Sequence, residues 1–252
     1  MSARGQAFGI DIGGSGVKGA LVDLATGDLV HERIKKATPH PATPSAVAET
    51  VAELVAESAW DGPVGLTLPS VVVNGVARTA ANIDPSWIDN DARQLFSQAL
   101  GGREVVVLND ADAAGLAEDR YGAARDTEGL VILLTFGTGI GSALLHRGEL
   151  VPNSELGHIE VHGKEAEHRA ASSVKERKGW SYRKWSSQVS KVLITLENLF
   201  QPAVFVVGGG ISRDADHWIP LLANRTPVVA AHLRNTAGIV GAAMAVDSGI
   251  AP

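Results

Sequence analysis

The stretch that decides the fold is FGIDIGGSGVKGALVDLATGDLV, residues 8–30. Residues 14–19 spell G-x-G-x-x-G, which indicates dinucleotide binding only when a strand precedes the pattern and a helix follows it. Here no helix follows the glycines. A second apolar run and a Thr26-Gly27-Asp28 turn come next, and apolar residues resume at Leu29 and Val30, which predicts strand, turn, strand, turn, strand. A P-loop is excluded because Ala20 stands where Lys-Ser or Lys-Thr is required. The sequence therefore predicts a glycine-tipped hairpin that binds phosphate through convergent backbone N–H groups, and not NAD.

A second stretch, LVILLTFGTGIGSALLHRGELV at residues 130–151, has the same predicted order of strands and turns. Gly137 takes the place of Gly13, and Gly148 takes the place of Gly27. This spacing predicts a duplicated unit, because solenoid repeats recur every 20 to 50 residues or so. Two such lobes would bring two phosphate-contacting loops to one cleft. Any two hairpins with glycine turns look alike, however, so the repeat alone leaves chance resemblance open.

The composition is that of a globular protein inside the cell. A chain of 252 residues with 45% hydrophobic content can bury a full core, as one large domain or as two lobes. The absence of cysteine excludes disulfides and thiolate metal sites, and it suits the reducing cytoplasm. No apolar run approaches the roughly 20 residues of a membrane span. The net charge of −6 argues against a general nucleic-acid partner. We therefore expect a cytoplasmic protein that binds neither membrane nor nucleic acid.

Helical and strand patterns alternate along the rest of the chain, which indicates the α/β class. Helices are predicted in the stretches 44–60, 111–122, 181–200 and 236–246, and strands after Gly62-Pro63, in 102–110 and in 203–212. We expect a smaller lobe of residues 1–109, completed by the C-terminal helix at 236–252, and a larger lobe of residues 110–235.

Polar residues end the predicted buried strand VVVLND. Asn109 and Asp110 lie at its carboxyl end, where open α/β sheets place their ligand crevices. Asp110 could accept a proton from a substrate hydroxyl, as the catalytic-base aspartate does in phosphoryl transfer. Alternatively it caps the helix that begins at Ala111, and spacing alone favours the cap. Asp112 competes for either role, although it should point elsewhere.

The segment PNSELGHIEVHGKEAEH, residues 152–168, is rich in acids and histidines. The alternation in HIEVH predicts a strand with His158, Glu160 and His162 on one face, and the spacing does not match the H-E-x-x-H zinc motif. Glu155 and His158 suit the hydroxyl groups of a polyhydroxylated ligand. A solvated edge strand is the alternative, and these residues alone favour it.

Several motifs together resemble the ROK family of sugar kinases, within the actin-like ATPase superfamily. They are GIDIGGSGVKGALVD, LNDADAAGLAEDRYGA, TFGTGIGSALL and LVPNSELGHIE, and the similarity covers nearly the whole chain. LTLPSVVVNGVARTAANIDPSW and the motif order are similar to ROK members that phosphorylate glucose with polyphosphate. The resemblance implies a two-lobed actin-like ATPase (ribonuclease H-like) α/β fold, with duplicated β-hairpin units around a central cleft. It also implies a homodimer that phosphorylates the 6-hydroxyl of glucose with inorganic polyphosphate, ATP or both, and with Mg²⁺.

The resemblance also assigns expected roles to residues of this chain. Asp110 would be the general base, and Asp11 would lie near Mg²⁺, through water. The sugar contacts would be Asn82, Asn109, Glu155, His158 and, with a weaker match, Glu167. The phosphate and nucleotide contacts would be Gly13, Gly14, Ser15, Lys18, Thr138, Gly139, Gly208, Gly209 and Gly210, the last three beside adenine if ATP is used. Many ROK members carry a cysteine-rich zinc motif, and since this chain has no cysteine we expect no zinc.

The phosphoryl donor is suggested by charge. Residues 164–191 hold eight basic and three acidic residues, a net +5 (8 − 3) in a chain of −6. Such a stripe suits a polyanionic donor, with Lys175, Arg177 and Lys178 as path residues, although a solvated helix face is the ordinary alternative. The other functions left open are an ATP-only kinase of glucose, mannose or an N-acetylhexosamine, and a non-catalytic sugar sensor.

Overall fold

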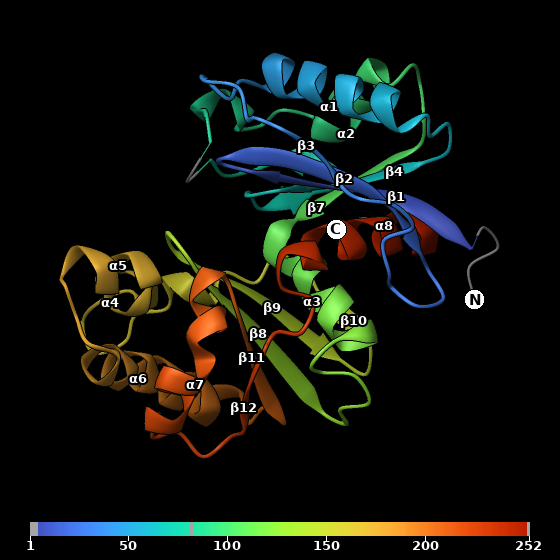
Figure 1. The fold of residues 1–252 in the computed structure, drawn as a ribbon. Helices are drawn as coiled ribbons and strands as arrows, with labels where there is room; N and C mark the ends of the chain where they lie inside the picture. Colours follow the sequence, from blue (N-terminus) through green and yellow to red (C-terminus); the bar gives the residue numbers. More distant parts are fainter. Residues whose placement is uncertain (1–4, 81–82, 251–252) are drawn as a thin grey trace. The chain divides into compact units, whose positions relative to one another are not determined.

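The computed structural model describes residues 5–80 and 83–250, so that Asn82, a predicted sugar contact, lies outside the described residues. The chain forms two compact units (Figure 1). The first consists of the chain up to Ala117 and the segment from Asn235 onward, and the second of Glu118–Arg234. Among the described residues, no helix is both long and apolar enough to cross a membrane.

The first unit contains a five-stranded sheet in the order β3-β2-β1-β4-β7. Its strands are β1 (Gln6–Gly13), β2 (Gly16–Asp23), β3 (Ile34–Lys36), β4 (Val64–Leu68) and β7 (Val105–Asn109). The first three pair antiparallel, and β4 and β7 run parallel to β1, which confirms the predicted hairpin. The third strand was predicted to begin at Leu29, and this is wrong. Leu29 forms only an isolated bridge with Val22, because the exposed polar residues 31–33 interrupt the pairing before β3.

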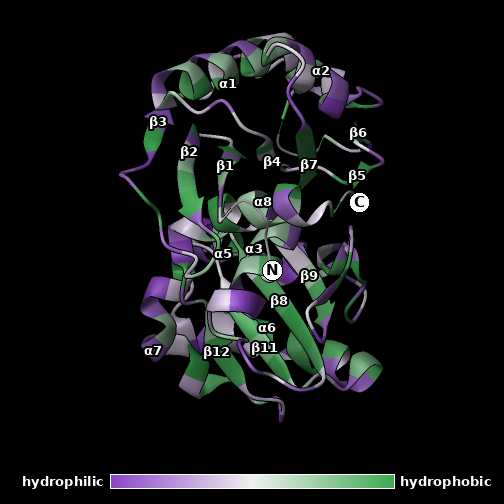
Figure 2. Cartoon of the chain, turned by 90° about the vertical axis from the view of Figure 1, so that its right-hand side faces the viewer, coloured by the Kyte–Doolittle hydropathy of each residue, from purple (hydrophilic) through white to green (hydrophobic). Residues whose placement is uncertain are grey.

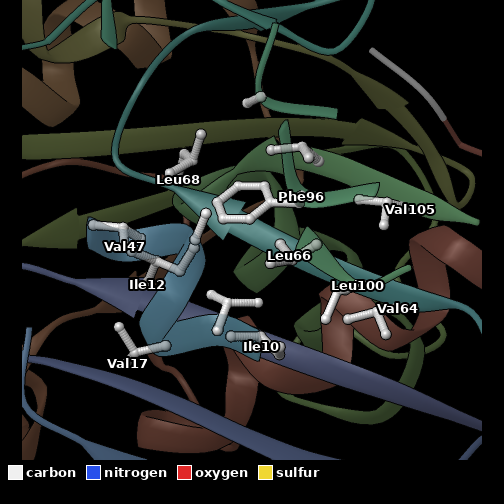
Figure 3. Packing of buried hydrophobic residues seen from close by; sticks show 14 of the residues in the cluster. Ile10, Ile12, Val17, Val47, Val64, Leu66, Leu68, Phe96, Leu100 and Val105 are labelled. Atoms are coloured by element: carbon white, nitrogen blue, oxygen red, sulfur yellow. The ribbon is translucent and has the colours of Figure 1, made fainter. Parts of the chain in front are cut away.

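Helices cover both faces of this sheet (Figure 1). On one face lie α1 (Pro44–Ser58) and α2 (Ala92–Ala99), and on the other lie α8 (Ala237–Ser248) and the start of α3 (Asp110–Tyr121). Figure 3 shows Ile10, Leu66 and Phe96 among the side chains that fill the core. A Cβ at Gly9 or Gly65 would collide with backbone of α8, so these two glycines allow the small-residue helix to lie directly on the strands.

The second unit repeats this topology in the order β10-β9-β8-β11-β12. Its strands are β8 (Leu130–Phe136), β9 (Ile140–His146), β10 (Glu149–Val151), β11 (Val204–Gly208) and β12 (Val228–Ala230). Again three strands pair antiparallel, and two more run parallel to the first strand of the hairpin. Two sheets with one order and one pattern of directions confirm the predicted duplication over chance resemblance of two turns.

The helices of the second unit are α4 (Ala166–Ala170), α5 (Ser172–Arg177), α6 (Tyr182–Phe200) and α7 (Ala215–Trp218). Figure 2 shows the hydrophobic strands β8 and β11 of its sheet. Trp185 of α6 packs edge-on against Phe136 of β8 and Trp218 of α7, with ring centroids 5.7 and 4.9 Å apart. Short remaining elements are β5 (Val72–Val73), β6 (Val76–Ala77) and 3₁₀ turns at Pro85–Trp87, Leu156–His158, Gly210–Asp214, Ile219–Leu221 and Arg234–Thr236.

Candidate active site

A carboxylate and an ammonium group face each other on the first hairpin. Asp11 of β1 and Lys18 of β2 are cross-strand partners, with Asp11 Oδ2 and Lys18 Nζ 3.5 Å apart. The Thr67 hydroxyl donates to Asp11 Oδ1 at 3.1 Å, and the start of α8 at Gly238 also borders this carboxylate. Both charged side chains keep about a quarter of their surface exposed (22% and 23%). The hairpin thus presents a positioned, solvent-accessible ion pair.

The tips of the two hairpins contain glycines that the fold does not require. An added Cβ at Gly14 or at Gly137 would meet no described heavy atom within 4 Å, and neither residue has a left-handed φ. Gly9, by contrast, has no room for a Cβ. Glycine is less stable than alanine where neither space nor φ demands it. The backbone at both tips is therefore bare and has room for a ligand to approach closely.

Each tip is braced by a hydroxyl group from outside the hairpin. Thr38 Oγ1 donates to the Gly13 carbonyl at 2.5 Å, and Ser172 Oγ donates to the Gly137 carbonyl at 3.0 Å. Because the C=O and N–H of a trans peptide point in opposite directions, each brace also sets the direction of the next N–H group. Sequence reasoning missed both hydroxyls, since one follows a strand, the other begins a helix, and no shared motif marks them.

Asn109, and not Asp110, caps the helix after β7. Asn109 Oδ1 accepts from the N–H groups of Ala111 (2.8 Å) and Asp112 (3.2 Å), and α3 already includes Asp110. The cap interpretation of Asp110 is therefore wrong. Asp110 is exposed in the first turn, whereas Asp112 is fully buried.

The Asn109 amide is almost fully used by the fold. Its Nδ2 donates to the Ser70 carbonyl at 3.1 Å, in addition to the two bonds that Oδ1 accepts. A side-chain amide makes about four hydrogen bonds, so one N–H remains for a ligand. Asn109 is thus held rigidly beside Asp110 at the carboxyl edge of the parallel strands.

The predicted strand over residues 158–162 is wrong. Residues 156–158 form a 3₁₀ turn, and Glu160 makes only an isolated bridge with Glu165. Two features cause this. Gly157 packs directly on the Ile140 carbonyl, which bends the chain, and the chain then reverses at His162 with a φ of 49°.

This fold of the segment gathers a different set of side chains from the one predicted. His158 lies 3.5 Å from Glu165 Oε2 and 3.8 Å from Glu155 Oε2, while Glu160 and His162 are exposed. His158, Glu165 and Glu167 each offer a ligand atom within 4.8 Å of the others. Glu155, His158 and Glu167, three of the predicted sugar contacts, therefore lie in one neighbourhood of the second unit.

The electrostatics of Glu155 reflect these neighbours. Partial loss of surrounding water raises the pKa of Glu155, the charge of Glu167 raises it further, and His158 opposes the shift. The Glu167 carboxylate in turn accepts from the Ile140 N–H at 3.4 Å and lies directly against Gly139, so it would have to shift to admit a side chain there. The second hairpin tip, with Thr138 and Gly139, thus adjoins this acidic group.

The glycine stretch at 208–210 lies at the same edge of the second sheet as the second tip, because Gly208 pairs in register with Thr135. Gly209 has a φ of 85° and packs on the Phe136 carbonyl, so the fold requires glycine there. Gly210 has neither constraint, since no described heavy atom lies within 4 Å of its added Cβ. The backbone at Gly210 is therefore open, as at the two tips.

Three basic residues, Lys175, Arg177 and Lys178, lie in α5 or directly after it, close in sequence to the serine that braces the second tip. The Lys175 ammonium lies 4.3 Å from the centre of the Tyr182 ring, and the Lys178 ammonium lies 4.7 Å from that of Trp180. In the described part of the chain, Lys175, Arg177 and Lys178 form no ion pair with a carboxylate. Their positive charge is therefore not neutralised locally.

Residues 7–171 match the sequence profile of the ROK family. The polyphosphate glucokinase of Mycobacterium tuberculosis (strain CDC 1551 / Oshkosh) is 64% identical over 238 residues, 94% of this chain and 90% of that protein. Two crystal structures are similar to this chain. The inorganic polyphosphate/ATP-glucomannokinase from Arthrobacter sp. strain KM has a TM-score of 0.92 and 49% identity, covering 98% of this chain and 100% of that one.

The second structure is a ROK family glucokinase from Streptomyces griseus in complex with glucose and AMPPNP. It has a TM-score of 0.81 and 25% identity, covering 95% of this chain and 98% of that one. These matches confirm the predicted fold class, the mixed α/β fold of the ROK sugar kinases. The chain therefore belongs to the ROK family.

Proposed function

We propose that this protein is a glucokinase, which transfers a phosphoryl group from inorganic polyphosphate, ATP or both to the 6-hydroxyl of glucose. The similarity to the M. tuberculosis and Arthrobacter enzymes supports the substrate and donor classes. The observation that carries the proposal is the pair of glycine tips, each open to a ligand, unneeded by the fold and braced by a hydroxyl group. Backbone N–H groups at such tips suit phosphate oxygens.

Asp110 is proposed as the general base. Its carboxylate would take the proton of the 6-hydroxyl as the oxygen attacks phosphorus, a role that fits its exposed place in the first turn of α3. The remaining N–H of Asn109 and the side chains of Glu155, His158 and Glu167 are proposed to hold sugar hydroxyls, and Asn82 is proposed as a further contact. Positioning of the sugar would supply much of the rate enhancement.

The phosphate contacts are proposed as predicted from the sequence: Gly13, Gly14, Ser15 and Lys18 on the first hairpin, Thr138 and Gly139 on the second, and Gly208–Gly210 for adenine when ATP is the donor. A kinase of this family requires a divalent metal, and we propose Mg²⁺ beside Asp11. The fit is good, because Mg²⁺ prefers one or two carboxylates together with phosphates and water, and the Asp11 carboxylate is partly exposed. Bound Mg²⁺ would neutralise phosphate charge.

Zinc is not proposed at the second unit's cluster. With no cysteine in the chain, His158, Glu165 and Glu167 would be a one-histidine, two-carboxylate set, and we assign His158 and Glu167 to the sugar instead. Metal analysis of the purified protein tests this directly. The homodimer, the cytoplasmic location and the lack of a nucleic-acid partner also remain predictions.

Lys175, Arg177 and Lys178 are proposed as the path along which polyphosphate runs. Their unneutralised charges suit a polyanion, and the similarity to polyphosphate-using enzymes favours this path over a merely solvated helix face. An ATP-only kinase has no need of such a path, and a sugar sensor has no need of the two open tips. Mannose differs from glucose at one ring position and is the main competing sugar.

The experiment that tests the proposal compares two alanine substitutions on one strand and its turn. Gly14→Ala should leave the free energy of unfolding unchanged or raise it by about 0.4–1 kcal/mol, because the fold accommodates the methyl group. Its kcat/KM for glucose phosphorylation should fall at least about a hundredfold, because the methyl group occupies the phosphate position. Gly9→Ala is the matched control and should destabilise the protein, because its Cβ collides with α8. A Gly14→Ala variant with wild-type kinetics would contradict the proposal.

A further inference from the structure

Lys35 lies in line with the ion pair of the first hairpin. In the sheet register Lys18 pairs with Asp11 on one side and with Lys35 on the other. Residues directly opposite on neighbouring strands share a face, with Cβ atoms about 5 Å apart. Asp11, Lys18 and Lys35 therefore form a row across β1, β2 and β3 on one face of the sheet.

The Lys35 side chain covers the glycine that ends the hairpin tip. Its Cε and Cγ atoms lie 3.2 and 3.9 Å from the position of an added Cβ at Gly16. The aliphatic stem is thus packed on bare backbone, and the ammonium group, one bond beyond Cε, lies beside the tip. A side chain at Gly16 would press on both this stem and the Lys36 carbonyl oxygen, each 3.2 Å from the added Cβ, so close packing rather than a left-handed φ explains Gly16.

The charge of Lys35 lacks a local partner. Lys18 has Asp11 at 3.5 Å, and the next residue of β3, Lys36, has Glu57 at 2.6 Å. Within the ranges that the structure describes, no carboxylate pairs with Lys35. Like charges opposite one another on neighbouring strands are unfavourable, and Asp11 offsets only the charge of Lys18, so an anion bound beside Lys35 would relieve the remaining repulsion.

We propose that Lys35 binds the anionic oxygens of the donor's phosphate groups at the first tip, beside Lys18 and the backbone of Gly14. This inference rests on the proposed function and names a binding residue for the same site. Lys18 shares its charge with Asp11, whereas Lys35 offers a full positive charge. Lys35 should therefore contribute mainly to donor binding, and less to the transfer step.

The experiment measures equilibrium binding of tripolyphosphate, without glucose, by the wild type and by Lys35→Gln, Lys35→Arg and Lys36→Gln. Lys35→Gln should weaken binding about tenfold and make it less sensitive to salt, as expected for one lost charged contact. Lys35→Arg should retain most of the affinity. Lys36→Gln is the matched control, since Lys36 points to the opposite face and is held by Glu57. In turnover, Lys35→Gln should raise KM for polyphosphate and change kcat little.

Different results would overturn the role of Lys35 and the glucokinase function. Wild-type affinity and wild-type KM in Lys35→Gln, in an enzyme that phosphorylates glucose, would overturn the role of Lys35 and leave the function standing. A tenfold loss of tripolyphosphate binding in an enzyme without glucose kinase activity would support Lys35 and overturn the function. Equal losses in Lys35→Gln and Lys36→Gln would contradict the assigned contact. Lys35 is exposed, and Lys36→Gln removes only a partly exposed ion pair with Glu57, so thermal unfolding should show all three variants folded.

Discussion

At the scale of single residues, the neighbours Asn109 and Asp110 have different roles: Asn109 caps α3, and Asp110 is the proposed general base. Sequence spacing placed both at the end of a strand but favoured Asp110 as the cap. The structure reverses this, because Asn109 Oδ1 accepts from two of the open N–H groups at the start of α3, those of Ala111 and Asp112. Two residues with capping side chains in a row cannot be told apart by spacing, since which one caps depends on where the helix starts.

We expect Asp110→Asn to lower kcat about 10²- to 10⁴-fold, the usual contribution of a general base, while the free energy of unfolding changes by less than about 0.5 kcal/mol. Asn109→Ala should instead cost about 1 kcal/mol or more of stability, because it removes the cap. Denaturant unfolding and steady-state kinetics measure both. Loss of stability in Asp110→Asn with kcat intact would mean that Asp110 serves the fold and not the reaction.

At the scale of elements, the predictions that succeeded rest on local pattern. The two hairpins, α1, α6 and α8 follow from turn glycines and periodicity within each segment. The segment 155–167 failed because its shape depends on a contact with β9, which lies outside it, at Gly157 and Ile140. The alternation of residue types in HIEVH cannot predict that contact, because it depends on a residue of another strand. Sequence patterns thus identified Glu155, His158 and Glu167 as candidates, but they wrongly placed His158 on one face with Glu160 and His162.

This segment makes a pH prediction. The pKa of Glu155 is raised, so its carboxylate is lost at a higher pH than that of an ordinary glutamate as pH falls. If the carboxylate binds the sugar, the acid limb of kcat/KM for glucose lies at a higher pH than an ordinary glutamate would give, since that ratio reports the pKa values of the free enzyme. Glu167→Gln removes a negative charge that raises the pKa, and should move the limb to lower pH. His158→Gln removes the opposing charge and should move it to higher pH. If the acid limb of kcat/KM lay at the same pH in the wild type, Glu167→Gln and His158→Gln, Glu155 would be excluded as the group that controls it.

At the scale of the whole molecule, the duplication was visible in the sequence and is complete in the structure. Both sheets have the same strand order, and both tips have a hydroxyl brace on the equivalent glycine carbonyl. The braces were not predictable, because Thr38 and Ser172 come from different kinds of element and share only their spatial role. The same holds for the buried Glu118, whose carboxylate accepts from the nearby N–H group of Ala123 and, more than a hundred residues away in the sequence, from those of His232 and Leu233.

The most direct test of the central claim is the formation of glucose 6-phosphate with Mg²⁺ and nucleotide-free polyphosphate, and separately with ATP. We expect turnover with polyphosphate in the wild type. In the variant with Lys175, Arg177 and Lys178 replaced by alanine, we expect a higher KM for polyphosphate, a weaker dependence of that KM on salt, and little change with ATP. Turnover with ATP alone would contradict the polyphosphate path, and no turnover with either donor would contradict the assignment as a glucokinase.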